Sequence, residues 1–418
     1  MSKIRLLSIS IFGNALEFYD FTLYGVFAAV IASHFFPSSD PVASLIASWG
    51  AFAAGFLMRP FGASIFGYIG DKMGRKKALT LSIILMGVPT FIIGCLPAYD
   101  EIGIIAPAIL ILCRLLQGLC TGGEYNGAAI YALEHMGRDR PGLSSGMITG
   151  SCVIGALIAT GVGSIALREG MPTWAWRVPF FLGALISVIG FYIRRNMSET
   201  PAFKASQKEH SSTKTTKIPL FEAFITHPKS TLLTMTLGGV NGALAYTLFG
   251  FSNMYLSRYI GLSITDAMHF NIIGLLSFCI SCPLTGLLMD RMGENRYYLC
   301  AVSLIMISIG PVFLALQEAS MTSIIVGQLM LGILTGSLAG PAHAYIQRLF
   351  PVRNRYSGIS FNFSLGMALI GGTTPMILIK LIDSTQNLFV PALYLGGCAL
   401  LLMSVLIFTR KHELEAHI

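Results

Sequence analysis

Apolar runs of about 20 residues or more recur from one end of the chain to the other, and each is long enough to cross a bilayer as a helix. Only 11% of the 418 residues are charged, whereas 54% are hydrophobic. A soluble domain is far less apolar than this. We therefore predict an all-α integral membrane protein with twelve spans, at residues 5–33, 42–70, 77–98, 102–133, 141–168, 175–195, 230–259, 264–289, 296–317, 321–348, 353–383 and 388–409.

A polar loop motif occurs twice between apolar runs. Residues 67–77 read Gly-Tyr-Ile-Gly-Asp-Lys-Met-Gly-Arg-Lys-Lys, and residues 286–296 read Gly-Leu-Leu-Met-Asp-Arg-Met-Gly-Glu-Asn-Arg. Both copies have the form G-x-x-x-D-[RK]-x-G. Their aspartates, Asp71 and Asp290, are 290 − 71 = 219 positions apart, about half the chain. This offset indicates an internal duplication.

A second pair of motifs supports the duplication. Gly118-x-x-x-Gly122 is repeated as Gly332-x-x-x-Gly336, an offset of 332 − 118 = 214. Such pairs of small residues let membrane helices approach closely. Two similar offsets predict a parallel repeat of two six-helix bundles. The basic, polar segment between spans six and seven separates them, which predicts an N-terminal bundle at 1–195, a cytoplasmic linker at 196–228, a C-terminal bundle at 229–409 and a short cytoplasmic tail at 410–418.

Basic residues set the predicted orientation, because cytoplasmic loops of membrane proteins are enriched in Lys and Arg. With the N-terminus inside, 22 of the 28 Lys and Arg are cytoplasmic, four are outside and two, Arg59 and Arg114, lie within spans. Both termini are then cytoplasmic. The net charge of +8 reflects this topology and gives no support for nucleic-acid binding. The first apolar run is too long for a signal peptide and is expected to remain in the protein.

The duplicated loops predict a conformational gate. Asp71 follows span two, where it can accept hydrogen bonds from a neighbouring helix N-terminus and pair with Arg75. Such a contact would hold one conformation. The alternative is a solvated turn whose charges serve only topology. The predicted gate residues are Gly67, Asp71, Gly74, Arg75, Asp290, Arg291 and Gly293.

Ionisable residues at membrane depth predict a transport site in the first half, because each costs at least about 2.5 kcal/mol on insertion scales and usually faces a cavity or partner. Such paired groups can titrate within the physiological range. The predicted proton-coupling residues are Glu17, Asp20 and Glu124, and the predicted substrate-binding residues of this half are Tyr24, Arg59, Arg114 and Gln117. The alternative is that these charges only brace the helices.

The second half offers polar rather than charged groups. Asn241, Tyr246 and Asn362 are predicted to complete the substrate site from the other side. All eight cysteines lie within predicted spans, so neither a disulfide framework nor a metal site is expected. The chain has no G-x-x-x-x-G-K-[ST] phosphate loop and no nucleophile with an adjacent base. We therefore expect no catalytic residues, no cofactor and no ATP-driven activity.

Four stretches carry motifs beyond the duplicated loops: Gly13-Asn14-Ala-Leu-Glu17-Phe-Tyr-Asp20-Phe, Arg59-Pro60-Phe-Gly62, Gln117-Gly-Leu-Cys-Thr-Gly122-Gly123-Glu124-Tyr125, and Phe350-Pro351 through Arg355-Tyr356-Ser357-Gly358 before Asn362. Together they resemble a known family, the metabolite:proton symporters of the major facilitator superfamily. The passages at 97–103 and 384–394 look closest to the proline/glycine betaine branch. One departure is the short segment after the last span, where an osmosensing member of that branch has a long coiled-coil extension.

The resemblance implies a proton-coupled symporter of a small zwitterionic solute that works by alternating access in a bacterial inner membrane. A site with both signs of charge suits a zwitterion. The alternatives are symport of an organic acid such as 2-oxoglutarate, citrate or shikimate, and a channel or transport-inactive sensor built on the carrier fold. The expected partners are the solute, a proton or else sodium, and the lipid bilayer, with function as a monomer.

Overall fold

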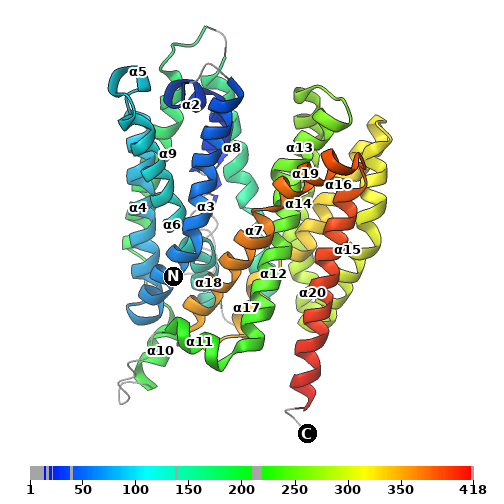
Figure 1. Ribbon diagram of the computed structural model, residues 1–418. Coiled ribbons are helices and arrows are strands. Elements are labelled where there is room, and N and C mark those ends of the chain that lie inside the picture. The colour runs from blue at the N-terminus through cyan, green and yellow to red at the C-terminus, as the bar shows by residue number, and fades with distance from the viewer. Residues whose placement is uncertain are drawn as a thin grey trace. The chain divides into compact units, whose positions relative to one another are not determined.

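The computed structural model describes residues 14–15, 18–20, 22–37, 41–136, 140–168, 170–209 and 219–415, and these residues form helices joined by short connections (Figure 1). Ten of the described helices are long and apolar enough to cross a membrane. They lie within a few residues of predicted spans three to twelve. The prediction of an all-α membrane architecture is confirmed.

The helices of the first half of the chain follow the predicted order. Their bounds are α2 (Ala28–Phe35), α3 (Pro41–Lys72), α4 (Arg75–Cys95), α5 (Tyr99–Ile102), α6 (Ile105–Met136), α7 (Pro141–Gly150), α8 (Cys152–Ala166), η1 (Ala175–Arg177), α9 (Val178–Arg195) and α10 (Pro201–Glu209). Helix α3 covers predicted span two. Described residues between 14 and 26, together with α2, form the helical part of predicted span one.

The second half is also helical, with π-helical turns inside two of its spans. The bounds are α11 (Pro219–Thr226), α12 (Pro228–Tyr246), η2 (Thr247–Phe251), α13 (Ser252–Met254), η3 (Tyr255–Tyr259), α14 (Ile264–Met292), α15 (Glu294–Gln317), α16 (Met321–Ala339), α17 (Ala342–Arg348), α18 (Arg355–Gly366), η4 (Met367–Gly371), α19 (Thr374–Thr385) and α20 (Val390–Glu415). Two helix starts are capped as their sequences predict. The hydroxyls of Ser263 and Ser320 accept hydrogen bonds from the backbone N–H three residues later.

Large apolar side chains cover much of the outer surface of these helices. Leu57 is 71% exposed and Ile307 is 74% exposed. A soluble protein rarely leaves extended apolar patches on its surface, whereas a bilayer is the solvent that such surfaces require. Hydrogen bonds within each helix also satisfy the backbone groups that lipid cannot.

The described residues group into two compact units. Unit 1 contains the described residues of 1–135, 151–220 and 352–361, and unit 2 contains those of 136–150, 221–351 and 362–418. Helix α7 therefore belongs to unit 2, and the start of α18 belongs to unit 1. The predicted bundle boundaries near 195 and 229 remain a prediction, because these contacts assign two short segments differently from a simple division at the linker.

Small residues allow close helix packing inside each unit. In unit 1, a Cβ at Gly118 would overlap the backbone of Gly55, and one at Gly122 would overlap the carbonyl of Arg59, so α6 lies directly against α3. In unit 2, Cβ atoms at Gly332 and Gly336 would overlap α14 at Ser277 and Ser281, respectively. The repeated G-x-x-x-G pattern thus makes the close approach that it predicts.

Candidate functional site

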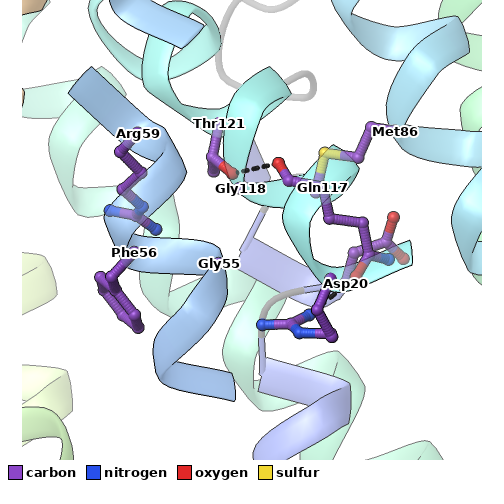
Figure 2. Close-up of a pocket in the computed structure, with 9 residues that line it drawn as sticks. Asp20, Gly55, Phe56, Arg59, Met86, Gln117, Gly118 and Thr121 are labelled. Atoms are coloured by element: carbon purple, nitrogen blue, oxygen red, sulfur yellow. Dashed lines mark hydrogen bonds between the residues drawn. The ribbon is translucent and has the colours of Figure 1, made fainter. Parts of the chain in front are cut away.

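A cavity in unit 1 brings together several of the predicted polar residues. The empty space among its lining atoms, including the part that is open to solvent, is about 300 Å³, and Figure 2 shows the side chains around it. The wall comes from α3, α4, α6 and the helical residues 18–20. The lining residues are Asp20, Gly55, Phe56, Arg59, Met86, Arg114, Gln117, Gly118 and Thr121.

Helix α6 presents its polar residues to this cavity as one stripe. Arg114, Gln117 and Thr121 follow a spacing of three and four residues, which places them on the same face of a helix. Figure 2 shows the Thr121 hydroxyl directed at Gln117, where it donates to the backbone carbonyl oxygen at 2.6 Å. Gly118 lies on the same stretch and packs against α3.

Four side chains form a continuous hydrogen-bonded chain beside the cavity. Arg114 Nη1 donates to Gln117 Oε1 at 2.8 Å, and Gln117 Nε2 donates to Thr90 Oγ1 at 2.9 Å. The Thr90 hydroxyl lies 3.0 Å from Asp20 Oδ2. All four residues are buried. A cation and an anion from different helices are therefore connected through two neutral polar side chains.

Asp20 is the acidic residue of the described cavity wall. Its side chain is only 6% exposed, and its Oδ1 atom has no hydrogen-bond partner among the described residues. A Cβ on Gly183 of α9 would overlap that oxygen, which shows how closely α9 covers it. A buried carboxylate with an oxygen that accepts no hydrogen bond costs free energy. Such a group calls for an explanation, and a functional role is one.

The two arginines of the cavity lie on different aromatic faces. The guanidinium carbon of Arg114 is 4.4 Å from the centre of the Tyr24 ring, and that of Arg59 is 4.6 Å from the Phe56 ring. Cation–π contacts of this kind stabilise the position of a guanidinium. Tyr24 is itself buried, and its hydroxyl donates to the Ser48 carbonyl at 3.1 Å. It supports Arg114 from behind and is not part of the cavity lining.

Glu124, one of the predicted proton-coupling residues, is not among the described lining residues. Glu124 forms a buried ion pair with Arg194 of α9 and accepts a hydrogen bond from Ser82 of α4. Arg194 also donates to the Leu79 carbonyl at 2.8 Å. Glu124 therefore ties three helices of unit 1 together, away from the cavity. Glu17 lies outside the described residues.

The polar residues predicted from the second half lie in unit 2. Asn241 of α12 is buried, and its Oδ1 atom has no partner among the described residues. Asn362 of α18 is also buried and donates to Thr231 Oγ1 at 3.4 Å. Tyr246 is half-buried at the end of α12. All three residues are thus polar side chains that are buried or half-buried within unit 2.

The first copy of the duplicated loop makes the predicted contact with a helix N-terminus. Asp71 Oδ1 accepts from the backbone N–H of Tyr356 at 3.1 Å, and Oδ2 accepts from that of Ser357 at 2.8 Å. Both donors belong to the first turn of α18, where N–H groups have no partner within the helix. Asp71 also pairs with Arg75 at 3.2 Å, with both side chains fully buried.

Further acidic groups surround Arg75. Its guanidinium lies 3.3 Å from Glu134, which also pairs with Arg355 at 3.1 Å and accepts from the Thr200 hydroxyl at 2.6 Å. Glu199 accepts from the backbone N–H groups of Arg75 and Lys76, the first residues of α4. The start of α4 and the start of α18 are thus both held by carboxylates in unit 1.

The second copy of the loop makes the same backbone contact in unit 2. Asp290 Oδ1 accepts from the N–H of Gly142 at 2.7 Å, and Oδ2 accepts from that of Leu143 at 3.0 Å, in the first turn of α7. Asp290 is half-buried, and Arg291, the residue after it, is exposed. Glu294, at the position equivalent to Arg75, pairs with Arg348 at 2.8 Å.

The first and last glycines of the motif are required for different structural reasons. Gly74 has φ +107° and Gly293 has φ +83°, so each stands at a turn that favours glycine. A Cβ at Gly67 would meet the backbone of Ser357 at 2.7 Å, and one at Gly286 would overlap the Gly142 carbonyl. Each first glycine therefore lets the partner helix start lie directly on the motif.

Sequence reasoning missed several residues of these sites. Thr90 is one of several hydroxyl residues within an apolar span, a pattern that gives no signal of its own. Arg194 was counted as a cytoplasmic topology residue, although it is buried with Glu124. Glu134 and Glu199 end or follow spans, where acidic residues are usually solvated. The partners in these ion pairs are separated by 59 to 221 positions in the sequence. No local sequence pattern therefore predicts the pairs.

The family follows from the comparison of the whole sequence with known proteins. The profile of the Major Facilitator Superfamily matches residues 10–375 and 255–417. The chain belongs to the major facilitator superfamily. It is therefore a multi-pass membrane transporter rather than an enzyme, and the twelve-helix architecture predicted from its apolar runs is that of the superfamily.

Relatives within the superfamily carry several transport names. The glycine betaine/proline/ectoine/pipecolic acid transporter OusA of Dickeya dadantii is 34% identical over 395 residues, which cover 92% of this chain and 78% of that protein. The proline/betaine transporter of Escherichia coli K12 is 33% identical over the same coverage. The shikimate transporter of Escherichia coli K12 is 31% identical over 417 residues, covering 97% of this chain and 95% of that protein.

Solved structures agree on the fold. The proton:xylose symporter XylE bound to 6-bromo-6-deoxy-D-glucose superimposes with a TM-score of 0.77 at 14% identity, covering 98% of this chain and 95% of the other. Another D-xylose-proton symporter structure gives a TM-score of 0.65 at 17% identity and 97% coverage of both chains. At these identities the likeness establishes the major facilitator fold.

Proposed function

We propose that this transporter is a proton-coupled symporter of a small zwitterionic solute of the proline/glycine betaine type. It works by alternating access as a monomer in a bacterial inner membrane, with both termini in the cytoplasm. The observation that carries the proposal is a cavity lined by Asp20 together with Arg59 and Arg114. The names of the proline and betaine transporters among the relatives support the same solute class.

The arginines bind the carboxylate of the solute in this proposal. A guanidinium offers several N–H donors in a plane and matches a carboxylate through paired hydrogen bonds. Arg114 is already oriented by Gln117 and the Tyr24 ring. Arg59 is held over Phe56 on the facing helix α3.

Asp20 carries the coupled proton. As a carboxylate it adds a negative charge to the cavity, and as a carboxylic acid it adds none, so its protonation makes the cavity more favourable to a bound carboxylate. Proton binding and solute binding then support each other. Glu17 remains a predicted second carrier. Because Glu124 is already paired with Arg194, we assign it to bracing the helices rather than to proton transfer.

The two loop motifs act as the conformational gate. Each aspartate holds the first turn of a helix, and each such contact must break and re-form if that helix start moves during transport. Asn241, Tyr246 and Asn362 of unit 2 are proposed to contact the solute on its other side. Their neutral groups suit hydrogen bonding to a small polar molecule.

A second candidate is proton symport of an organic acid. Two arginines and one aspartate among the described lining residues leave an excess of one positive charge, which favours a monoanionic solute. The likeness to a shikimate transporter over 95% of that protein's length is in keeping with this candidate.

Counterflow in proteoliposomes tests the function directly. Vesicles preloaded with labelled proline are challenged outside with proline, glycine betaine, 2-oxoglutarate, citrate and shikimate. The same assay is then repeated with each other compound as label. Exchange with proline or betaine supports the zwitterion proposal, and exchange with an acid alone replaces it by the second candidate. Flux without saturable counterflow would indicate a channel, and no flux with any solute would indicate a transport-inactive protein or another substrate.

Uptake under imposed gradients identifies the coupling ion. A pH gradient should accelerate uptake, and a sodium gradient at constant pH should not. Arg114→Ala should abolish uptake because the carboxylate loses its oriented partner. Arg258→Ala is the matched control, since that arginine pairs with Asp383 in unit 2 and its side chain is 56% exposed. Normal uptake by Arg114→Ala would show that the cavity charges are structural.

A further inference from the structure

Thr90 of α4 lies directly behind Asp20 and is only 1% exposed. Its Oγ1 atom has three polar neighbours. These are Asp20 Oδ2 at 3.0 Å, the Met86 carbonyl oxygen at 3.0 Å and Gln117 Nε2 at 2.9 Å. A hydroxyl has one proton to donate and two lone pairs that accept. The hydroxyl can therefore donate to only one of these three neighbours and can accept from at most two.

The direction of each hydrogen bond follows from Arg114. A guanidinium only donates, so the Gln117 atom that faces Arg114 must be the carbonyl oxygen Oε1. The amide nitrogen of Gln117 then faces Thr90 and donates to it. Thr90 must accept from Gln117, which leaves its single proton for either Asp20 or the Met86 carbonyl.

The protonation state of Asp20 decides between these two acceptors. An ionised carboxylate is the stronger acceptor, so the hydroxyl donates to Asp20 Oδ2. When Oδ2 carries a proton, the hydroxyl can turn to the Met86 carbonyl and accept from Asp20 on its second lone pair. A proton on Oδ1 would have no acceptor among the described residues, because that atom has no hydrogen-bond partner there.

We propose that Thr90 is the positioning residue for the coupled proton: its hydroxyl donates to ionised Asp20, accepts from protonated Asp20, and links either state to Arg114 through Gln117. This inference rests on the proposed role of Asp20 as the proton carrier. Protonation transfers one proton from a hydronium ion to Oδ2: an O–H bond of hydronium breaks, an O–H bond forms on Asp20, and one water molecule is released. The only other change is rotation of the Thr90 O–H.

Few other charged or titratable groups face Asp20 from the described elements packed around it. They are Arg114 on α6, Arg59 on α3 across the cavity, and the phenol of Tyr19 on the helix of Asp20 itself. Helix α4 contributes Thr90 and Met86, and α9 contributes Gly183. Among the described residues, Thr90 is thus the hydrogen-bond partner of Asp20 that can both donate and accept.

Thr90→Val tests the proposal, because valine has nearly the same shape as threonine and lacks the hydroxyl. The variant loses the hydrogen bond that Thr90 donates to ionised Asp20, and it also loses the weaker one that Thr90 accepts from protonated Asp20. The ionised form of Asp20 is therefore destabilised more than the protonated form. The midpoint of Asp20 titration should therefore rise by about 1 pH unit. Thr90→Ser is the matched control. It keeps the hydroxyl and should remain close to the parent protein.

The readout is pH-titrated infrared difference spectroscopy of the full chain in liposomes, which needs no substrate. The carboxylic acid band that disappears in Asp20→Asn reports Asp20. The expected result is a band midpoint raised in Thr90→Val and unchanged in Thr90→Ser. An unchanged midpoint in Thr90→Val, or equal shifts in both variants, would overturn the proposal. If Thr90→Val does not insert, Thr90→Ala provides the same loss of the hydroxyl with a smaller side chain.

Transport separates this inference from the proposed function. The pH profile of gradient-driven uptake should move in Thr90→Val in the same direction as the band, while solute exchange at constant pH should persist. A shifted band in a protein whose uptake ignores the pH gradient would leave the Thr90 contact intact and refute proton coupling. Proton-driven uptake with the same pH profile in Thr90→Val and the parent would refute the inference alone.

Discussion

The two copies of the loop motif hold their partner helices in the same way but differ in electrostatic surroundings. Asp71 and Asp290 each accept two hydrogen bonds from the first turn of a helix. Around Asp71, Arg75 and Glu134 are also buried and paired. Around Asp290, the residue equivalent to Arg75 is Glu294, and its partner Arg348 is 57% exposed.

The difference shows which part of the motif determines which part of the structure. The residues that both copies share produce the contact between the aspartate and the backbone N–H groups of the partner helix. The first glycine admits the helix start, the aspartate accepts its N–H groups, and the last glycine makes the turn. The residue after the last glycine determines whether a buried ion-pair network forms. We therefore expect the first loop to depend strongly on charge and the second mainly on backbone capping.

Removing the carboxylate of the first copy should have the largest effect. Asp71→Ala leaves two helix N–H groups unsatisfied and takes one anion from the buried Arg75 network. Breaking a buried pair from one side typically costs about 3–5 kcal/mol. The free energy of unfolding in mixed micelles should fall by this amount. A loss no larger than that of the equivalent Asp290→Ala change would show that the surrounding charges add nothing.

Neutralising Glu134 should have the next largest effect. Glu134→Gln keeps an acceptor but removes the charge shared by Arg75, Arg355 and Thr200. Hydrogen bonds to charged groups contribute about 1.5–3 kcal/mol, so we expect a loss of about 2 kcal/mol. The same micelle titration measures it. In the double variant with Asp71→Ala the two losses should fall short of additive, because both changes act on Arg75; additive losses would mean that the two carboxylates act independently.

Removing the carboxylate of the second copy should cost less. Asp290→Ala removes a helix cap from α7 without disturbing a buried arginine. Loss of a capping group costs about 0.5–2 kcal/mol. Added salt should change this loss little, whereas it should change the effect of charge substitutions at exposed sites. A loss above that of Glu134→Gln would reverse the order that the comparison predicts.

Sequence patterns predicted the elements of this molecule better than its side-chain partners. Ten spans could be placed because a bilayer requires long apolar helices, which leave a continuous signal. The contact of Asp71 with a helix start was predictable from the duplicated spacing. Asp20, Arg59 and Arg114 were predicted to share a site because charges at membrane depth usually face a cavity or a partner, and the structure places all three around one cavity. Their roles remain a prediction.

The remaining partners depend on packing between helices distant in sequence. Glu124 has the right depth and helix face for the cavity, yet Arg194 reaches it from α9 and Ser82 from α4. Nothing in the local sequence tells whether Glu124 lines the cavity or pairs with Arg194 and Ser82. Thr90 was not predicted for a related reason. A single hydroxyl in an apolar helix usually bonds its own backbone, as Thr90 does with Met86, and only the fold adds Asp20 and Gln117.

The smallest expected effect belongs to Glu294, the residue that distinguishes the second loop from the first. Its ion pair with Arg348 is partly open to solvent, with side-chain exposures of 19% and 57%. Exposed pairs of this kind contribute about 0.2–1 kcal/mol and weaken in salt. Glu294→Ala should therefore lower the free energy of unfolding by less than about 1 kcal/mol, and high salt should erase the difference. The matched change in the first loop, Arg75→Ala, should be many times more costly and insensitive to salt. Similar losses at the two positions would mean that the buried network of Arg75, with its two carboxylate partners, contributes no more than one partly exposed ion pair.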